Sequence, residues 1–65
     1  MSMEYIRRAY GVPAKRGGRV EYVHVDAGET LRGTIVGSRN QYLRVRWDHE
    51  AFTRTHHPTS VVYVD

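Results

Sequence analysis

Five short runs with the composition of β-strands follow one another closely, and their spacing restricts the fold more than any other feature of the chain. β-branched and aromatic residues, which favour extended backbone, concentrate in residues 19–25, 31–36, 41–47, 52–56 and 60–64. A parallel crossover needs about a dozen residues or more, and none of the connections is that long, so the strands are predicted to form an antiparallel meander. A small meander hides its edges best by curling up. We therefore predict an all-β fold, a small five-stranded antiparallel barrel.

The segments between the predicted strands have turn chemistry. Gly37 and Asn40, which both tolerate positive φ, belong to the predicted turn before the third strand. Pro58 cannot donate a ladder hydrogen bond, so it is predicted to mark a short connection between the last two strands. Gly33 lies inside an apolar run, where we expect a bulge or a close backbone approach.

The first residues follow a different period. Apolar side chains recur three and four positions apart at Met3, Ile6 and Tyr10. This spacing predicts one or two helical turns, which end before Gly11 and Pro13. A helix this short is not stable alone, so we expect it to pack on the barrel or to be partly ordered. The domain organisation is then a helical turn and exposed basic arm over residues 1–17, and the barrel over residues 18–65.

Size and composition limit how the chain can be stabilised. It has 65 residues and no cysteine, which excludes disulfides and thiolate metal sites, so stability must come from apolar packing or from a partner. The candidate core residues are Val20, Tyr22, Ile35, Leu43, Val45, Trp47, Val62 and Val64. The N-terminus has no apolar h-region, and no run approaches membrane-spanning length. We expect a soluble, unprocessed, cytoplasmic protein.

Charge is distributed unevenly along the chain. The net charge is +3, but residues 1–47 hold nine Lys and Arg against four acids, and residues 48–65 hold one Arg against three acids. These counts correspond to +5 and −2. Clustered Lys and Arg are the electrostatic signature of nucleic-acid binding. A charged surface that merely keeps a small domain soluble is the alternative.

One strand places an aromatic ring and two guanidinium groups side by side. In residues 41–47, Leu43, Val45 and Trp47 alternate with Tyr42, Arg44 and Arg46, so one set faces the core and the other faces outward. The arginine fork binds phosphate and stacks on bases, and stacking of a base on an aromatic side chain is worth about 1–3 kcal/mol. The predicted nucleic-acid site comprises Arg32, Arg39, Tyr42, Arg44 and Arg46, assisted by Lys15, Arg16 and Arg19.

A solvated face is the alternative for the same arginines. Arg44 and Arg46 would then pair across strands with carboxylates. The candidates for that pairing are Glu21, Glu29 and Glu50. Exposed pairs of this kind contribute little to stability, and the face would then be solvated or would bind a protein.

Half of the chain resembles a known barrel type. The segments GGRVEY, LRGTIVG and YLRVRW, within residues 17–47, carry a glycine before a first inward valine at Gly18 and Val20, and a glycine before a β-branched pair at Gly33. They resemble the small SH3-like barrels of the KOW and Tudor type. The resemblance implies contact with nucleic acid or with the transcription and translation machinery for KOW domains, and an aromatic cage for methylated peptides in Tudor domains. No such cage is evident in the sequence.

A second resemblance covers nearly the whole chain. The segments YIRRAYGVPAKRGGRV, LRGTIVGSR, YLRVR and HPT are similar to a family of short, mostly uncharacterised proteins of actinobacterial phages and their hosts. That family often has a tryptophan after HPT, where this chain has Ser60. The resemblance implies a phage origin and a place in the host cytoplasm, and it brings no established activity.

Metal and catalytic sites are not predicted. His49, His56 and His57 are ligand types, but adjacent strand residues face opposite ways, so the last two cannot easily share an ion. His57 is instead expected to fix the corner at Pro58 by hydrogen bonding to backbone. The chain has no phosphate-binding glycine loop of the Walker or dinucleotide type, and a chain this small seldom encloses a pocket. We therefore expect no cofactor and no enzymatic activity.

Binding to a host protein is the alternative function. Tyrosine and arginine are enriched at protein interfaces. The aromatic residues available for such contacts are Tyr5, Tyr10, Phe52 and Tyr63. An exposed edge strand could also add to a partner's sheet or form a homodimer. The alternative is thus a phage-encoded adaptor or inhibitor of a host protein.

Overall fold

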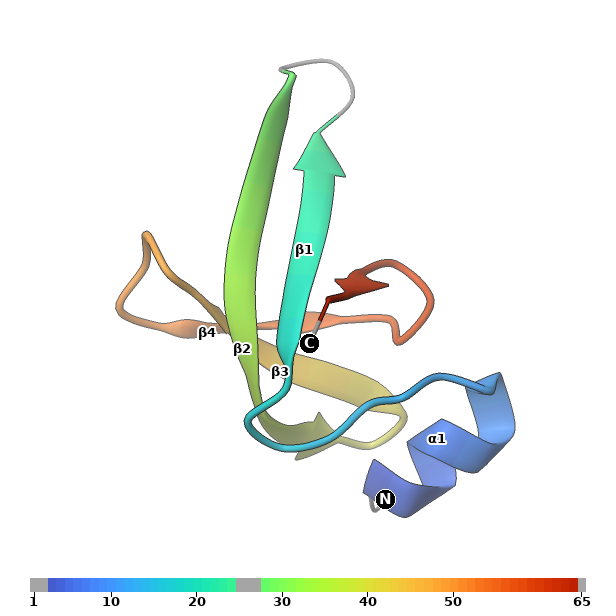
Figure 1. Ribbon diagram of the computed structural model, residues 1–65. Helices are drawn as coiled ribbons and strands as arrows, with labels where there is room; N and C mark the ends of the chain where they lie inside the picture. Colours follow the sequence, from blue (N-terminus) through green and yellow to red (C-terminus); the bar gives the residue numbers. More distant parts are fainter. Residues whose placement is uncertain (1–2, 25–27, 65) are drawn as a thin grey trace.

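The computed structural model describes residues 3–24 and 28–64, which form one helix followed by a five-stranded antiparallel sheet (Figure 1). The elements are α1 (Met3–Tyr10), β1 (Arg19–His24), β2 (Glu29–Arg39), β3 (Tyr42–Trp47), β4 (Thr53–His56) and β5 (Val62–Tyr63). The strand order is β4-β3-β2-β1-β5. The first four strands are therefore a meander, and β5 returns to the free side of β1. The predicted helical turn and antiparallel topology are confirmed.

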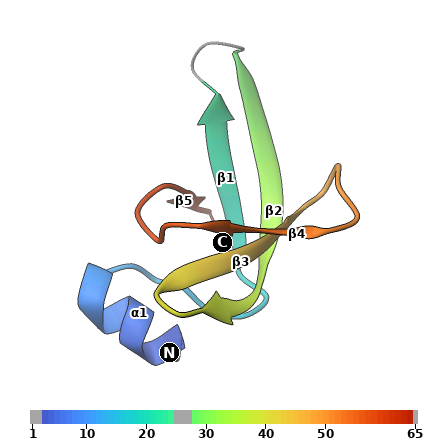
Figure 2. The ribbon, with the colours of Figure 1, turned by 180° about the vertical axis from the view of Figure 1, so that it is seen from behind.

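The sheet bends strongly but does not close. In Figures 1 and 2, β1 and β2 stand as one long hairpin, and β3 and β4 run across it. The pairing of β2 with β3 shifts register between Ile35 and Gly37, and such a bulge increases local twist. Within the described residues, β4 and β5 occupy the two outer positions and do not pair with each other. The prediction of a closed barrel is therefore wrong, because edge strands of four and two residues offer too little backbone for a closing ladder.

The core lies on one face of the sheet, called here the inner face. Its buried side chains are Ile6, Ala14, Val20, Ile35, Leu43, Val45, Trp47 and Val61. Five of the predicted core residues are among them, and Tyr22 packs against them while half-buried. α1 lies at the end of the sheet away from the β1–β2 tip (Figure 1) and contributes the fully buried Ile6. The opposite face of the sheet is called the outer face.

The last strand has the reverse facing from the one predicted. Val62 and Val64 are 53% and 46% exposed, whereas Val61 is 7% exposed. β5 pairs with β1 so that Tyr63 lies opposite the inward Val20. Because strand side chains alternate, Val62 must then point outward. Val61 enters the core from the loop before the strand.

The arm of residues 11–18 exposes Lys15 and Arg16, as predicted, but the arm is also anchored to the rest of the fold. Ala14 is completely buried, and the Arg7 guanidinium donates a hydrogen bond of 2.8 Å to its carbonyl. The Gly17 N–H donates to the Ile35 carbonyl at 2.7 Å, and the Ile35 N–H donates to the Gly18 carbonyl at 2.9 Å. The arm is thus fastened to β2 beside its bulge.

The structure also tests the roles predicted for Gly33, for Gly37 and for the turn between β2 and β3. A Cβ on Gly33 would lie 2.7 Å from Cε3 of Trp47, so of the two expectations for Gly33 the close approach is correct. The β2–β3 hairpin turns at Asn40, which has φ 56°. Gly37, expected in that turn, instead pairs with Arg44 inside the strand. The composition of residues 26–30 also predicts a turn between the first two strands, but Glu29 and Thr30 belong to β2, and residues 26 and 27 lie outside the described residues.

Candidate nucleic-acid interface

The outer face of β3 carries the row of side chains that the alternation predicted. Tyr42, Arg44 and Arg46 are exposed, and the residues between them are buried. Across the ladder on β2, Arg39 lies opposite Tyr42, and Gly37 lies opposite Arg44. The hairpin therefore brings Arg39, Tyr42 and Arg44 onto one surface.

Some of the predicted basic residues are already paired with carboxylates. Arg19 makes two hydrogen bonds to Asp48, of 3.0 and 2.7 Å, and a third of 2.7 Å to the Thr34 hydroxyl. The hydrogen bond from Arg19 lowers the pKa of Asp48 below its usual range, and the charges of Arg46 and Arg32 lower it further. This half of the outer face is close to charge balance.

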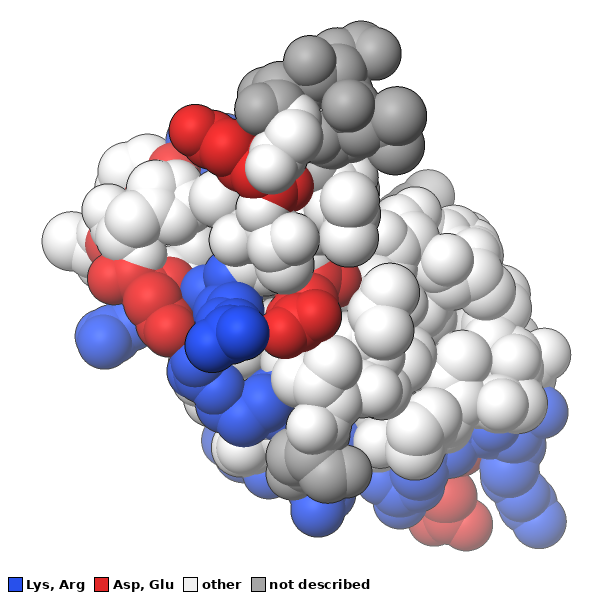
Figure 3. Space-filling model, turned by 45° about the horizontal axis from the view of Figure 1, so that its top comes forward, with Lys and Arg blue, Asp and Glu red and all other residues white. Residues whose placement is uncertain are grey.

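Arg32 and Arg54 are paired as well. The Arg32 Nε lies 3.1 Å from Oε2 of Glu21, and Arg54 binds Glu50 on the inner face. In the middle of the face drawn in Figure 3, basic side chains lie directly beside acidic ones. The alternative, in which Arg44 and Arg46 pair across strands with Glu21, Glu29 or Glu50, is not seen among the described residues. Glu21 and Glu50 pair with Arg32 and Arg54 instead, and Arg44 donates to the Thr53 hydroxyl at 3.2 Å.

Three arginines gather near the β2–β3 turn, and we call them the arginine cluster: Arg16, Arg39 and Arg44. Among the described residues, none of the three has a carboxylate within ion-pair distance. A Cβ on Gly37 would lie 3.7 Å from the Arg16 guanidinium. Arg16 therefore lies over the glycine that pairs with Arg44.

Tyr42 stands beside the arginine cluster and is held by aromatic contacts. Its ring centroid is 6.1 Å from that of His57, which in turn packs edge-on against Tyr10 at 4.8 Å. The Thr59 N–H donates to Nδ1 of His57 at 3.2 Å, so the predicted role of His57 in fixing the corner by bonding to backbone is confirmed. Tyr42 remains 40% exposed and available for stacking.

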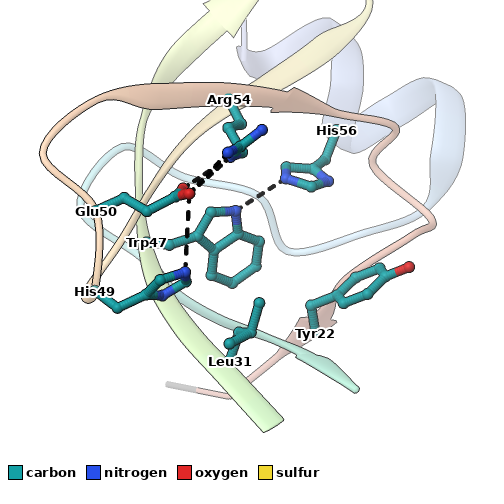
Figure 4. A pocket seen from close by; sticks show the side chains of 7 residues that line it. All are labelled: Tyr22, Leu31, Trp47, His49, Glu50, Arg54 and His56. Atoms are coloured by element: carbon teal, nitrogen blue, oxygen red, sulfur yellow. Dashed lines mark hydrogen bonds and ion pairs between the residues drawn. The ribbon is translucent and has the colours of Figure 1, made fainter. Parts of the chain in front are cut away.

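The inner face holds a pocket that the sequence did not reveal. It has a volume of about 360 Å³, and its walls include Tyr22, Leu31, Trp47 and His56 (Figure 4). The Trp47 indole N–H donates to Nε2 of His56 at 3.0 Å. Burial, followed by the charge of Arg54, lowers the pKa of His56 below its ordinary value.

One end of the inner pocket is polar. Glu50 points into it and receives hydrogen bonds of 2.8 and 3.1 Å from Arg54, and Nε2 of His49 lies 3.8 Å from the same carboxylate. The Glu50 side chain is only 14% exposed. The hydrogen bond from Arg54 lowers the pKa of Glu50, so the pair is ionised at neutral pH. The sequence signal for this pocket was the alternation of β4, which places Arg54 and His56 on the inner face.

A second hollow runs along the edge strand β4, and we call it the edge groove. It is lined by Ser38, Arg39, Arg44, Thr53, Arg54, Thr55 and His56. Arg39 and Arg44 belong to the arginine cluster, and Arg54 and His56 also line the inner pocket. In the described part of the chain, the edge groove therefore connects the arginine cluster with the inner pocket past the unpaired edge of β4.

The remaining predicted residues are distributed as follows. Arg46 lies opposite Thr34, between the arginine cluster and Asp48, and Lys15 is an exposed residue of the turn that carries Arg16. No group of three metal-ligating side chains is found in residues 3–23 and 28–64. The only described helix, α1, is too short to span a membrane.

Comparisons with protein-family models, with curated proteins and with solved structures found no match to this chain.

Proposed function

We propose that this protein is a non-enzymatic module that binds nucleic acid through the arginine cluster and Tyr42. The observation that carries the proposal is the contrast among its arginines. Arg19, Arg32 and Arg54 are each paired with a carboxylate, whereas no carboxylate among the described residues lies within ion-pair distance of Arg16, Arg39 or Arg44. Guanidinium groups without a carboxylate partner are suited to phosphate, because the planar fork donates two parallel hydrogen bonds.

Tyr42 adds a contact that does not depend on charge. Its ring lies opposite Arg39 in the ladder and is held by His57, so little side-chain entropy is lost when a base stacks on it. Such stacking is tolerant of sequence. The resemblance of residues 17–47 to KOW-type SH3-like barrels supports the same function, with the sheet here left open. If the chain is phage-encoded, its partner is a nucleic acid in the host cytoplasm.

The salt dependence of binding tests this proposal. Fluorescence anisotropy of a labelled single-stranded oligonucleotide would be measured at 50 and 200 mM salt. Each phosphate contact contributes a slope of about −0.7 on single strands, so three contacts predict about a 20-fold loss of affinity over this range. Arg44→Gln should bind more weakly at 50 mM and lose only about 7-fold, because one phosphate contact is removed.

Arg32→Gln is the matched control for Arg44→Gln. It removes the same charge from the same face, but at a position already paired with Glu21. It should keep the wild-type salt dependence. Equal effects of the two variants would show that net charge alone drives binding. Failure of the wild-type protein to bind at 50 mM salt would reject the proposed function.

The opposite edge of the outer face favours the second candidate, a protein partner. Val23, Val62 and Val64 are about half exposed there, and Val62 lies opposite Glu21 in the pairing of β5 with β1. An apolar strand edge of this kind can pair with a host protein or with a second copy of the chain. Analytical ultracentrifugation of the wild type and of Val62→Lys tests for the homodimer, which the lysine should abolish.

A further inference from the structure

We propose that the inner pocket receives one unstacked base of a single-stranded nucleic acid whose backbone lies on the arginine cluster. This inference rests on the proposed function and adds to it a preference for single strands. A base inside a duplex is stacked and paired, and it reaches such a pocket only after it has been extruded at a cost in energy. A single strand meets no such barrier.

Continuity of the surface is the first argument. The edge groove begins at Arg39 and Arg44 and ends at Arg54 and His56, which are also walls of the inner pocket. β4 is an outer strand of the sheet, and within the described residues no other strand pairs with its free side. A strand of nucleic acid can therefore pass from the arginine cluster around β4 to the pocket.

The walls of the inner pocket are suited to a flat apolar ring. The centroid of the Tyr22 ring lies 6.4 Å from that of Trp47, with an angle of 69° between the ring planes, and 6.1 Å from that of His56, with an angle of 41°. Leu31 adds an aliphatic wall. The volume of about 360 Å³ is within the usual range of small-ligand sites, about 300–1,000 Å³. Aromatic side chains accept every base because each base has a π-face.

The polar end matches the edge of a base better than it matches a cation. Glu50 offers acceptor oxygens and Arg54 offers donors, and a base edge carries groups of both kinds. A carboxylate has about four acceptor positions, so Glu50 can bind Arg54 and still accept from a ligand. The charges of the two residues cancel, which removes the main attraction for a cationic side chain.

Trp47 provides a direct readout, because it is the only tryptophan of the chain and forms a wall of the pocket. The protein would be titrated at pH 7.5 with an 8-nucleotide single strand and with the corresponding duplex, and Trp47 emission and anisotropy of the labelled oligonucleotide would be recorded together. The single strand should bind more tightly and quench Trp47 to saturation. The duplex should give an anisotropy change with little quenching.

Tyr22→Leu and Tyr22→Phe separate stacking from packing. Leucine keeps apolar bulk on the inner face but has no aromatic ring, so Tyr22→Leu should lose affinity for the single strand by about 5- to 150-fold, the range expected for one stacked base. Tyr22→Phe should bind as the wild type does. Circular dichroism would establish that both variants are folded, and duplex affinity should be unchanged in both.

The outcomes distinguish this inference from the proposed function. Equal affinity for single strand and duplex without any change in Trp47 emission would overturn the base pocket and leave binding by the arginine cluster intact. Loss of duplex binding in Tyr22→Leu as well would point to damage of the fold and contradict a role in base stacking. Quenching of Trp47 by an arginine-rich peptide but not by oligonucleotides would assign the pocket to a cation and overturn the inference.

Discussion

Trp47 belongs to the core of this protein and also lines its inner pocket. The indole ring covers Gly33 on one side, and the indole N–H donates to His56 on the other. The side chain is 2% exposed, so both neighbours are fixed by packing. Each of these two contacts leads to a prediction about a single residue.

Gly33→Ala should destabilise the protein. The added Cβ would lie 2.7 Å from Cε3 of Trp47 and 2.9 Å from the Arg46 carbonyl oxygen, closer than atoms can pack. Overpacking of this kind typically costs about 1–3 kcal/mol, measurable by urea denaturation. Gly37→Ala is the control in the same strand, because its Cβ would meet only the Arg16 guanidinium at 3.7 Å. Equal stability of Gly33→Ala and the wild type would contradict the position of Trp47.

Stability should fall as the pH falls from 7.5 to 5.5. Burial and Arg54 lower the pKa of His56 in the folded protein, and Glu50 opposes this only in part. In the unfolded chain a histidine titrates near 6.5, so the unfolded state takes up its proton first, and protonation favours unfolding. The loss begins below about pH 6.5 and ends once the pH has crossed the folded pKa.

His56→Gln is the variant that tests this assignment. It should remove most of the pH dependence between 7.5 and 5.5, measured by urea denaturation at several pH values. If His56→Gln loses stability with acid as steeply as the wild type does, the titrating group lies elsewhere.

Among the secondary-structure elements, β5 is one in which strand pairing, and not composition, determines which side chains face the core. Three valines, Val61, Val62 and Val64, lie in or next to this strand and are chemically alike, so the sequence alone could not say which of them faces the core. The ladder with β1 places Tyr63 opposite Val20 and so turns Val62 outward. A strand of two residues has no alternating pattern of its own by which its facing could be predicted.

The orientation of the last strand in the structure and the one predicted from the sequence lead to opposite expectations for the stability of Val→Ala variants. Val61→Ala should cost about 1–3 kcal/mol, because Val61 is 7% exposed and burial of a valine side chain contributes roughly that amount. Val62→Ala should change the free energy of unfolding by at most about 0.5 kcal/mol, as is usual for surface positions. Urea denaturation of both variants measures the difference. A larger loss for Val62→Ala would restore the facing predicted from the sequence.

β2 and α1 also have features that the sequence alone could not predict. The sequence predicted a turn from Gly37 onward, but β2 continues to Arg39 because the bulge absorbs the irregularity inside the strand. The helix was predicted correctly from its three- and four-residue spacing. That Ile6 and Ala14 complete the core depends on how the arm docks against β2, which is a tertiary contact.

For the whole molecule, connection lengths were sufficient to predict an antiparallel meander, and strand alternation was sufficient to predict the outward row on β3. Closure of the sheet could not be predicted, because it depends on the length and position of the last strands. The pairing of Arg19 with Asp48 spans 29 positions in sequence and has no local signal. The division of the basic residues into neutralised and available groups therefore required the structure.

The available arginines, and not net charge in general, define the proposed binding surface. A chain of 65 residues is well suited to two-dimensional ¹H–¹⁵N NMR, which locates that surface directly. On titration with a short single-stranded oligonucleotide, the largest shifts are expected at Arg16, Gly37, Arg39 and Arg44, with smaller shifts at the β1–β5 edge. Shifts concentrated around Val23 and Val62, or spread evenly over all arginines, would contradict binding by the arginine cluster.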